Sequence, residues 1–198
     1  MGFRISYIIA PVTPRDLVKP LGFQLGIETD ALPYDEWWVG NLKSNGLTVL
    51  WSEAEDFVDD VSAELAALSK SGEVYACRVN ETMMHAQAVC YANGHEKWRI
   101  SWRGEDGPKP ENLLATGALP DGFAALLEKQ TQTQADDATV DHFFEIPLEM
   151  VSATAAFRHD YDATNKAFSR FFRIAEAQDA PEPEPVAKKG LLARLLGR

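Results

Sequence analysis

The sequence predicts an α+β fold built on an antiparallel sheet. Two Asn-Gly dipeptides, at 45–46 and 93–94, each separate two strand-like segments, which is the strongest short-range signal of a β-hairpin. Strand-like and helix-like segments do not alternate regularly, which argues against a doubly wound parallel sheet. With 198 residues, 45% of them hydrophobic, the chain suffices for one ordinary domain with its own core. We therefore expect one domain over residues 1–174 with three to four packed helices, then a disordered acidic proline-rich linker over 175–187, and a short C-terminal amphipathic helix over 188–198.

The chain is expected to begin with a strand and a short helix. Apolar residues alternate over Phe3–Ala10, as in a buried strand. Thr13 precedes Pro14, which combines an N-cap residue with the proline favoured at the first helical position, so a short helix should run to about Lys19. Residues 21–36 are expected to form an irregular loop.

The first hairpin leads into the best-defined helix of the sequence. Its arms are expected over Trp37–Lys43 and Leu47–Trp51. Ser52–Glu55 has the S-x-x-E pattern of a capping box, and the apolar stripe after it predicts one helix that ends at Gly72. Glu73–Asn80 is expected to be the next strand.

The second hairpin should turn at Asn93-Gly94 with a two-residue loop. One face would then be an aromatic core layer that pairs Trp98 with Val89, Ile100 with Gln87, and Trp102 with His85. The opposite face would pair Lys97 with Cys90, Arg99 with Ala88, and Arg103 with Met84. Three cations among small residues predict an anion-binding or partner-binding strip, Lys97, Arg99 and Arg103. The alternative is a solvated sheet face whose cations pair with nearby acids.

The last third of the body has weaker signals. The expected elements are a short strand over 113–116, a helix from Asp121 that loses its pattern near 130–137, a strand over 143–146, a helix from Pro147 to about Ala156, and a strand or helix over 167–174.

Charge and cysteine content limit the possible partners and compartment. The formal net charge is -11; the linker contributes −4 and the C-terminal segment +4, so residues 1–174 carry the full −11. Such a body is repelled by phosphate backbones, which argues against nucleic-acid binding. Cys77 and Cys90 are expected to be buried thiols in a reducing cytoplasm, with a disulfide as the alternative. No apolar run approaches the eighteen residues of a membrane-spanning helix, so we expect a cytoplasmic protein.

Histidines next to carboxylates are the only candidates for catalysis or metal binding. His142 follows Asp141 and His159 precedes Asp160, and the two pairs bracket the helix that begins at Pro147. If they converged, they would supply metal ligands or an Asp–His acid/base pair. Otherwise residues 158–160 form a hydrogen-bonded turn at the helix C-terminus. The sequence has no defined metal-ligand spacing, nucleophile elbow or dinucleotide fingerprint, so we expect no cofactor and favour a non-enzymatic domain.

The C-terminal segment combines an apolar face with basic residues. A helix would gather its four leucines on one side, because they lie at positions i, i+1, i+4 and i+5. The leucines are Leu191, Leu192, Leu195 and Leu196, and the basic residues are Lys188, Lys189, Arg194 and Arg198. Eleven helical residues span ~16 Å, about half of a hydrocarbon core, so the helix can lie on a membrane but cannot cross it.

This segment resembles the membrane-targeting helix of the bacterial division-site ATPase MinD, in which lysines and a glycine also precede a short apolar and basic run. The resemblance implies reversible binding to an anionic membrane surface. It stops at these eleven residues, because the body has no phosphate-binding loop. A groove on a protein partner and a solvated tail without a binding role are the alternatives.

The body also has a resemblance of its own. Its segments Met1–Ser6, Asn93–Trp98, Phe144–Glu149 and Phe157–Asp160 are similar to a family of small uncharacterised bacterial cytoplasmic proteins. The resemblance implies a bacterial origin and a compact domain, and it implies no activity or site residues.

Together these observations predict a non-enzymatic cytoplasmic domain that the C-terminal helix recruits reversibly to the inner face of the plasma membrane. One alternative is an adaptor or immunity-like protein whose tail docks into a protein partner. Another is a small enzyme or a ligand or metal sensor that uses His142, His159 and Asp160. The sequence leaves the oligomeric state open.

Overall fold

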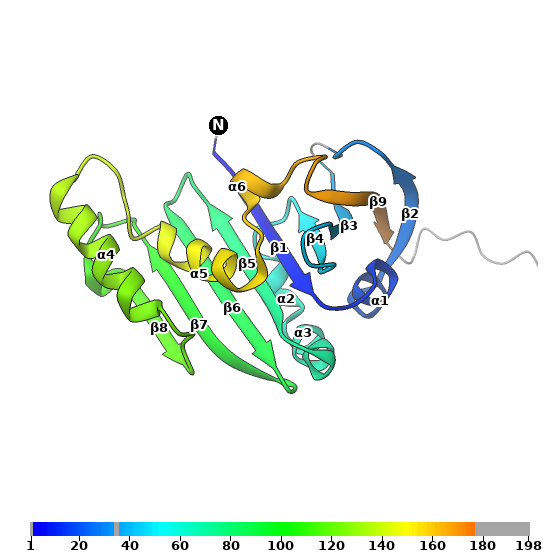
Figure 1. Ribbon diagram of the computed structural model, residues 1–198, viewed down its shortest axis with the longest axis horizontal. Coiled ribbons are helices and arrows are strands. Elements are labelled where there is room, and N and C mark those ends of the chain that lie inside the picture. The colour runs from blue at the N-terminus through cyan, green and yellow to red at the C-terminus, as the bar shows by residue number, and fades with distance from the viewer. Residues whose placement is uncertain (1, 34–35, 177–198) are drawn as a thin grey trace, which may run out of the picture.

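The computed structural model describes residues 2–33 and 36–176, and their strands form one antiparallel sheet (Figure 1). Its nine strands lie in the order β2-β9-β3-β4-β1-β5-β6-β7-β8. They are β1 Arg4–Ala10, β2 Phe23–Thr29, β3 Trp38–Leu42, β4 Thr48–Ser52, β5 Val74–Asn80, β6 His85–Ala92, β7 His95–Arg103, β8 Leu113–Gly117 and β9 Phe168–Glu176. The first strand is thus central, and the last is inserted between β2 and β3. The α+β class with an antiparallel sheet is confirmed.

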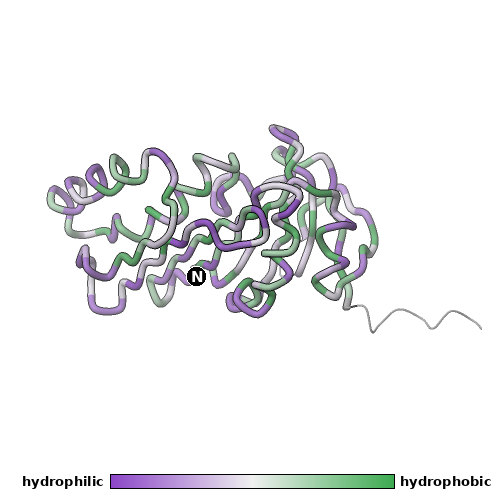
Figure 2. Tube along the Cα trace, turned by 90° about the horizontal axis from the view of Figure 1, so that it is seen from below, coloured by the Kyte–Doolittle hydropathy of each residue, from purple (hydrophilic) through white to green (hydrophobic). Residues whose placement is uncertain are grey.

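Helices lie on both sides of this sheet (Figures 1 and 2). The described residues form six α-helices and three 3₁₀ turns: α1 Pro14–Val18, α2 Phe57–Asp60, α3 Ser62–Leu68, α4 Phe123–Asp136, α5 Glu145–Ala155, α6 His159–Asp162, η1 Lys19–Leu21, η2 Ser69–Ser71 and η3 Pro110–Asn112. The sequence predicted three to four helices. The structure has more because one predicted helix is divided in two and α6 was not foreseen.

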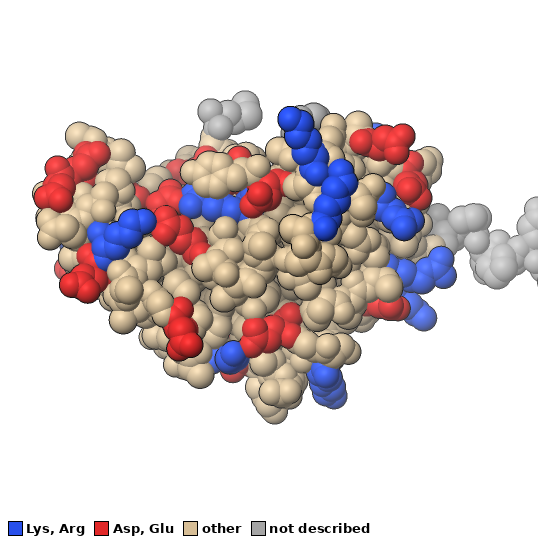
Figure 3. Space-filling view, viewed as in Figure 1, with Lys and Arg blue, Asp and Glu red and all other residues tan. Residues whose placement is uncertain are grey.

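The sheet separates two hydrophobic cores. Alternate residues of β1 point to opposite sides, so Ile5 and Tyr7 join the core beneath α5, whereas Ile8 joins the core beneath α1, α2 and α3. Acidic and basic side chains are interspersed on the face that carries α4 and α5, which shows no extended patch of one sign (Figure 3).

The N-terminal elements follow their sequence signals, with one exception. β1 and α1 form as predicted, and the Thr13 hydroxyl caps α1 by accepting a hydrogen bond from the Asp16 N–H at 3.3 Å. Residues 21–36 were predicted to be a loop, which is wrong over Phe23–Thr29. This segment is the edge strand β2, in which Phe23, Leu25 and Ile27 alternate with Gln24, Gly26 and Glu28, so the strand period was present in the sequence and was overlooked.

The predicted capping box does not begin a helix. Ser52 is the last residue of β4, where its hydroxyl accepts from the Ala54 N–H at 2.9 Å and closes a tight turn. Helical structure starts only at Phe57, and it is interrupted at Val61, which lies outside the helical region and separates α2 from α3. The single long helix was therefore wrong in its start and its continuity, although its apolar stripe does face the sheet.

The second hairpin turns where predicted, but its register is wrong beyond the turn. Tyr91 pairs with Glu96 as a two-residue loop requires, whereas Cys90 pairs with Trp98, because a β-bulge adds one residue to β7. Because of this one-residue shift, the residues of β7 are paired with the opposite face of β6 from the one predicted. Trp98, Ile100 and Trp102 pair with Cys90, Ala88 and Ala86, so the small residues make room for the large core side chains.

Two further predictions near the C-terminal end of the body need correction. Phe143–Ile146 is not a strand, because α5 already begins at Glu145; Pro147 falls in its first turn, where the missing N–H costs no helical hydrogen bond. α4 continues through the polar stretch to Asp136. The undecided segment 167–174 is the strand β9, which continues through Ala175 to Glu176 and so extends past the predicted end of the body.

The remaining predictions divide between the described and undescribed residues. Both cysteines are free and buried. No helix in the described part of the chain combines the length and apolar character needed to cross a bilayer. The predicted C-terminal helix, 188–198, and most of the linker lie outside the described residues.

Candidate functional site

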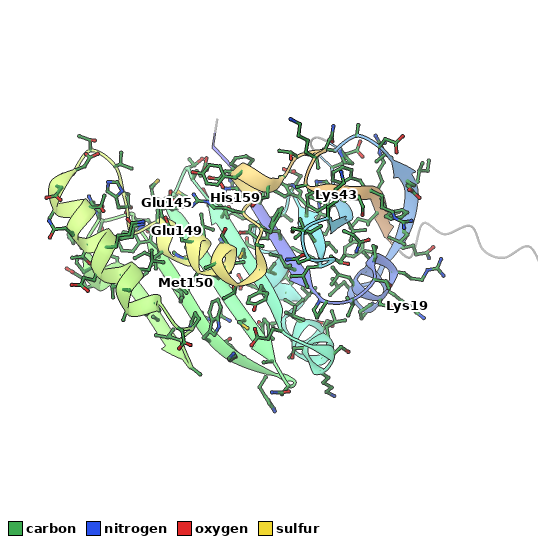
Figure 4. The ribbon with its side chains drawn as sticks, viewed as in Figure 1. Lys19, Lys43, Glu145, Glu149, Met150 and His159 are labelled. Carbon is green, nitrogen blue, oxygen red and sulfur yellow. The ribbon has the colours of Figure 1, made fainter. Side chains whose placement is uncertain are left out.

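The candidate site lies at the end of the sheet where β1 begins and β4 and β5 end. Helix α6 covers this end, and His159, its first residue, lies close to the start of β1 (Figure 4). The antiparallel pairing of β1 with both neighbours brings the start of β1 beside the last residues of β4 and β5. Residues far apart in the sequence therefore meet here.

His159 is buried between aromatic rings and two carboxylates. Its side chain is 1% exposed; its ring lies edge-on to Phe3 at 4.9 Å and roughly parallel to Tyr7 at 6.1 Å, between centroids. Its Nε2 lies 3.8 Å from a Glu81 oxygen and its Nδ1 lies 4.0 Å from an Asp160 oxygen. Neither nitrogen has a hydrogen-bond partner among the described residues.

The imidazole of His159 is neutral at pH 7. Burial lowers its pKa from the usual value of 6.5, and this effect outweighs the nearby carboxylates of Asp160 and Glu81, which act in the opposite direction. A neutral imidazole has one donor and one acceptor nitrogen. It can donate to only one of the two carboxylates, so its other nitrogen presents a lone pair toward the second. The acceptor nitrogen of His159 therefore has no hydrogen-bond donor among the described residues.

Arg158 fixes α6 and the site to the rest of the body. Its guanidinium pairs with Glu145 at the start of α5 and with Asp160, to which Nε donates at 2.8 Å. Its guanidinium carbon also lies 4.8 Å from the ring centre of Tyr161. Arg158 is itself buried. Because the cation bridges two carboxylates from different elements, it holds Asp160 in position beside His159.

A pocket of about 350 Å³ opens beside His159. Its walls are mostly apolar, and they include Phe3 and Trp51, whose ring centres are 6.1 Å apart. The polar side chains at its wall are His159, Asp160, Glu53 and Arg4. Glu53 accepts a hydrogen bond from the Trp51 indole at 2.7 Å, and the exposed Arg4 guanidinium lies 3.7 Å from Glu55, which is not among the residues of this pocket. The pocket is close to the smallest size of small-molecule sites.

The residues beneath the pocket do not include an activated nucleophile. Tyr7 and Cys77 are opposite each other on β1 and β5. Burial raises the pKa of the Cys77 thiol to about 12, and burial, with Cys77 next in effect, raises the pKa of Tyr7. Both groups therefore stay protonated at neutral pH. Hence neither group is an activated nucleophile.

The two predicted histidine–carboxylate pairs do not converge. The backbone N–H of His142 donates to Gln134 and its Nε2 lies 3.9 Å from Asp137, on the connection that follows α4. The neighbours of His159 belong instead to β1, α6 and the β5–β6 turn. In residues 2–33 and 36–176, no group of three or more His, Cys, Asp or Glu side chains is placed to hold a metal ion.

The three cations of the predicted strip do not form one surface facing small residues. Lys97 lies at the bulge, where its Nζ is 2.6 Å from Glu73 Oε1, and the guanidinium of Arg99 is 2.7 Å from Glu96. Arg103, at the other end of β7, is opposite His85 in the β6–β7 ladder. The predicted partners were wrong because of the register shift, and two of the three cations are already paired with acids.

Sequence reasoning identified His159 and Asp160 but missed the rest of the pocket. Trp38 and Trp51 were placed correctly on strands, yet nothing local indicated that they would stack at 5.6 Å beside the start of β1. Glu81 lies in a turn without any motif. The tail residues predicted to bind a membrane or a partner, 188–198, lie outside the described residues.

Comparisons of the chain with protein-family models, with curated proteins and with solved structures found no match.

Proposed function

We propose that the body is a non-enzymatic binding domain whose pocket beneath α6 takes a small organic cation with an apolar body. The observation that carries this proposal is the buried His159, whose ring nitrogens have no hydrogen-bond partner among the described residues and which lies beside carboxylates and aromatic rings. An ammonium group supplies a donor for the acceptor nitrogen.

The surroundings of the pocket favour positive charge. Glu53 and Asp160 lie at its wall and Glu81 lies beside His159. The two nearby cations already have acidic partners, because Arg158 bridges two carboxylates and Arg4 at the wall lies 3.7 Å from Glu55. The aromatic rings of Phe3 and Trp51 add a cation–π contribution of about 0.5–2 kcal/mol. The net charge of -11 also raises the local concentration of cations around the protein.

Three probes of similar size and different charge test this proposal: phenethylamine, phenethyl alcohol and phenylacetate. At about 100 times its Kd, a ligand stabilises the native state by about 2.7 kcal/mol, a rise in Tm of about 5–10 °C for a chain of this size. We expect the largest rise with phenethylamine and none with phenylacetate. Glu53→Gln should reduce the response, whereas Glu28→Gln, an equal charge change on the exposed edge strand β2, should not. Equal responses to all three probes would contradict the proposal.

The tail suggests a second function, recruitment of this domain to the inner face of the plasma membrane. The observation in its favour is the sequence spacing of Leu191, Leu192, Leu195 and Leu196 in a segment whose charged residues are all basic. Burying a leucine contributes roughly 1.5–3 kcal/mol, and a basic residue near an anionic leaflet adds about 1 kcal/mol. The cost of ordering the backbone offsets most of this gain, so one copy should bind weakly and reversibly.

Sedimentation with anionic vesicles tests the recruitment. The full chain should sediment at low salt, and Leu192→Glu with Leu195→Glu should abolish binding. Val186→Glu with Ala187→Glu makes the same charge change outside the leucine face and should reduce binding much less. Binding that is insensitive to salt and does not require anionic lipid would favour a protein partner for the tail instead.

A further inference from the structure

An aromatic groove lies on the opposite side of the sheet from the pocket. Phe23, Trp37 and Phe57 pack around one another with ring centres 4.7–5.7 Å apart, and Trp37 and Phe23 remain partly exposed. Ile174 of β9 completes the groove beside Phe23 and Trp37. We call these four residues the aromatic groove. Trp37 also lines a second hollow, together with Phe57 and Asp60 of α2.

The border of the aromatic groove is acidic. The hollows that meet at Trp37 are lined by the carboxylates Glu36, Glu53, Glu55, Asp56 and Asp60. The cations that pair with this set are Arg4, Arg78 and Arg173. Five carboxylates against three cations leave an excess of negative charge next to the partly exposed rings of Phe23 and Trp37. The exposed Asp60 has no ion pair among the described residues.

The tail leaves the body beside this groove. The last residue of β9, Glu176, is opposite Phe23 in the β2–β9 ladder. The linker from 177 to 187 reaches about 34 Å when extended. This length is ample for a groove that starts on the neighbouring strand, and a short linker gives an effective concentration in the millimolar range. A weak contact is therefore enough to fill the groove.

We propose that residues 188–198 of the same chain dock on the aromatic groove when they are not bound to a membrane. The leucine face covers Phe23 and Trp37, and Lys188, Lys189 and Arg194 lie against the acidic border. Amphipathic segments commonly bind apolar grooves in this way, through anchors one helical turn apart. Membrane and groove then compete for the same leucines. The inference rests on the proposed membrane-binding role of the tail, because it states how that role is regulated.

A spin label at the C-terminus of the full chain tests the docking directly. Gly197→Cys provides one reactive thiol, since Cys77 and Cys90 are fully buried. The indole N–H signals of the tryptophans serve as reporters in a ¹⁵N-labelled chain, with Trp37 assigned from Trp37→Phe. We expect the label to remove most of the Trp37 signal and to leave Trp98 and Trp102, which lie in the opposite core, unaffected.

Two controls keep the spin-label result specific. Leu192→Glu with Leu195→Glu should restore the Trp37 signal. The second control mixes spin-labelled chain at natural isotope abundance with ¹⁵N-enriched chain that carries no spin label. The Trp37 signal should also persist in this mixture. Loss of the signal in that mixture would overturn the proposal in favour of docking between two copies. An unaffected Trp37 in the labelled chain would overturn it altogether.

Vesicle binding separates failure of the docking from failure of the recruitment. Glu36→Gln, Asp56→Asn and Asp60→Asn together should free the tail and strengthen binding to anionic vesicles on the order of 3- to 10-fold, because the apparent affinity scales with the free fraction. Glu105→Gln, Asp106→Asn and Glu128→Gln make the same charge change far from the groove and should have a smaller effect. Equal effects of the two triple variants would contradict the docking. If no variant binds vesicles, the recruitment fails, and the spin label still decides the docking.

Discussion

His159 combines a basic side chain with a site that disfavours its charge. Burial opposes protonation, whereas Glu81 and Asp160 favour it, and burial dominates. The two carboxylates remain close because other partners hold them: Glu81 accepts from the Phe3 N–H at 2.9 Å, and Asp160 is bound by Arg158. At the scale of single residues, the site is thus preorganised to receive a donor.

The lowered pKa of His159 makes stability depend on pH. Because the unfolded state binds a proton more readily than the folded state, the free energy of unfolding should fall as pH falls below about 6.5. His85, whose pKa is lowered by burial and then by Arg78 and Arg103, should contribute in the same direction. Urea unfolding between pH 5 and 8 should show that the free energy of unfolding changes less with pH in His159→Gln than in the parent chain.

The exposed His95 provides the control, and His95→Gln should keep the full pH dependence of the free energy of unfolding. An unchanged pH dependence in His159→Gln would show that His159 does not carry the effect.

At the scale of elements, turns were predictable from the sequence and the register beyond them was not. The Asn93-Gly94 pair predicted the hairpin turn correctly, because both residue types readily adopt the positive φ found at these positions. The bulge in β7 was not predictable, since it depends on long-range packing of the tryptophans on β7 and on the approach of β8. Likewise, Ser52–Glu55 has a capping pattern, but pairing of β4 with β1 keeps Ser52 in the sheet.

Gly117 tests how closely β8 approaches the bulge. A Cβ at this position would overlap the carbonyl oxygen of Lys97, whereas a Cβ at Gly46, which has a similar positive φ, meets nothing within 4 Å. Both alanine substitutions cost about 1–2 kcal/mol for the backbone conformation. Gly117→Ala should cost a further 1–3 kcal/mol or so from overpacking, measured by urea unfolding. Equal costs at the two positions would show that the approach is not tight.

At the scale of the whole molecule, the sheet order could not be read from the sequence. β9 pairs with both β2 and β3, so the end of the body closes the sheet between two early strands. Similarly, the pocket draws on β1, β3, β4 and α6, and only His159 and Asp160 were marked by their residue types. Local periodicity identified most elements, whereas their contacts depend on pairings between residues far apart in the chain.

The position of β9 predicts how truncation affects folding. A chain that ends at Glu176 should unfold cooperatively with a Tm within about 2 °C of the full chain, since it keeps all nine of the described strands. A chain that ends at Asn165 lacks β9 and should lose much of its cooperativity, because β2 and β3 no longer have a shared neighbour. Calorimetry distinguishes the two. A cooperative, unchanged transition in the shorter chain would show that β9 adds little to stability.

The pocket beside His159 is proposed to bind a small organic cation. The most direct measurement follows the indole N–H signal of Trp51, which donates to Glu53 at the pocket wall, while phenethylamine is added to the full ¹⁵N-labelled chain. We expect a saturable shift of the Trp51 signal, with the signal of Trp37, on the opposite side of the sheet, unchanged. No shift at Trp51, or equal shifts at both tryptophans, would contradict the proposal.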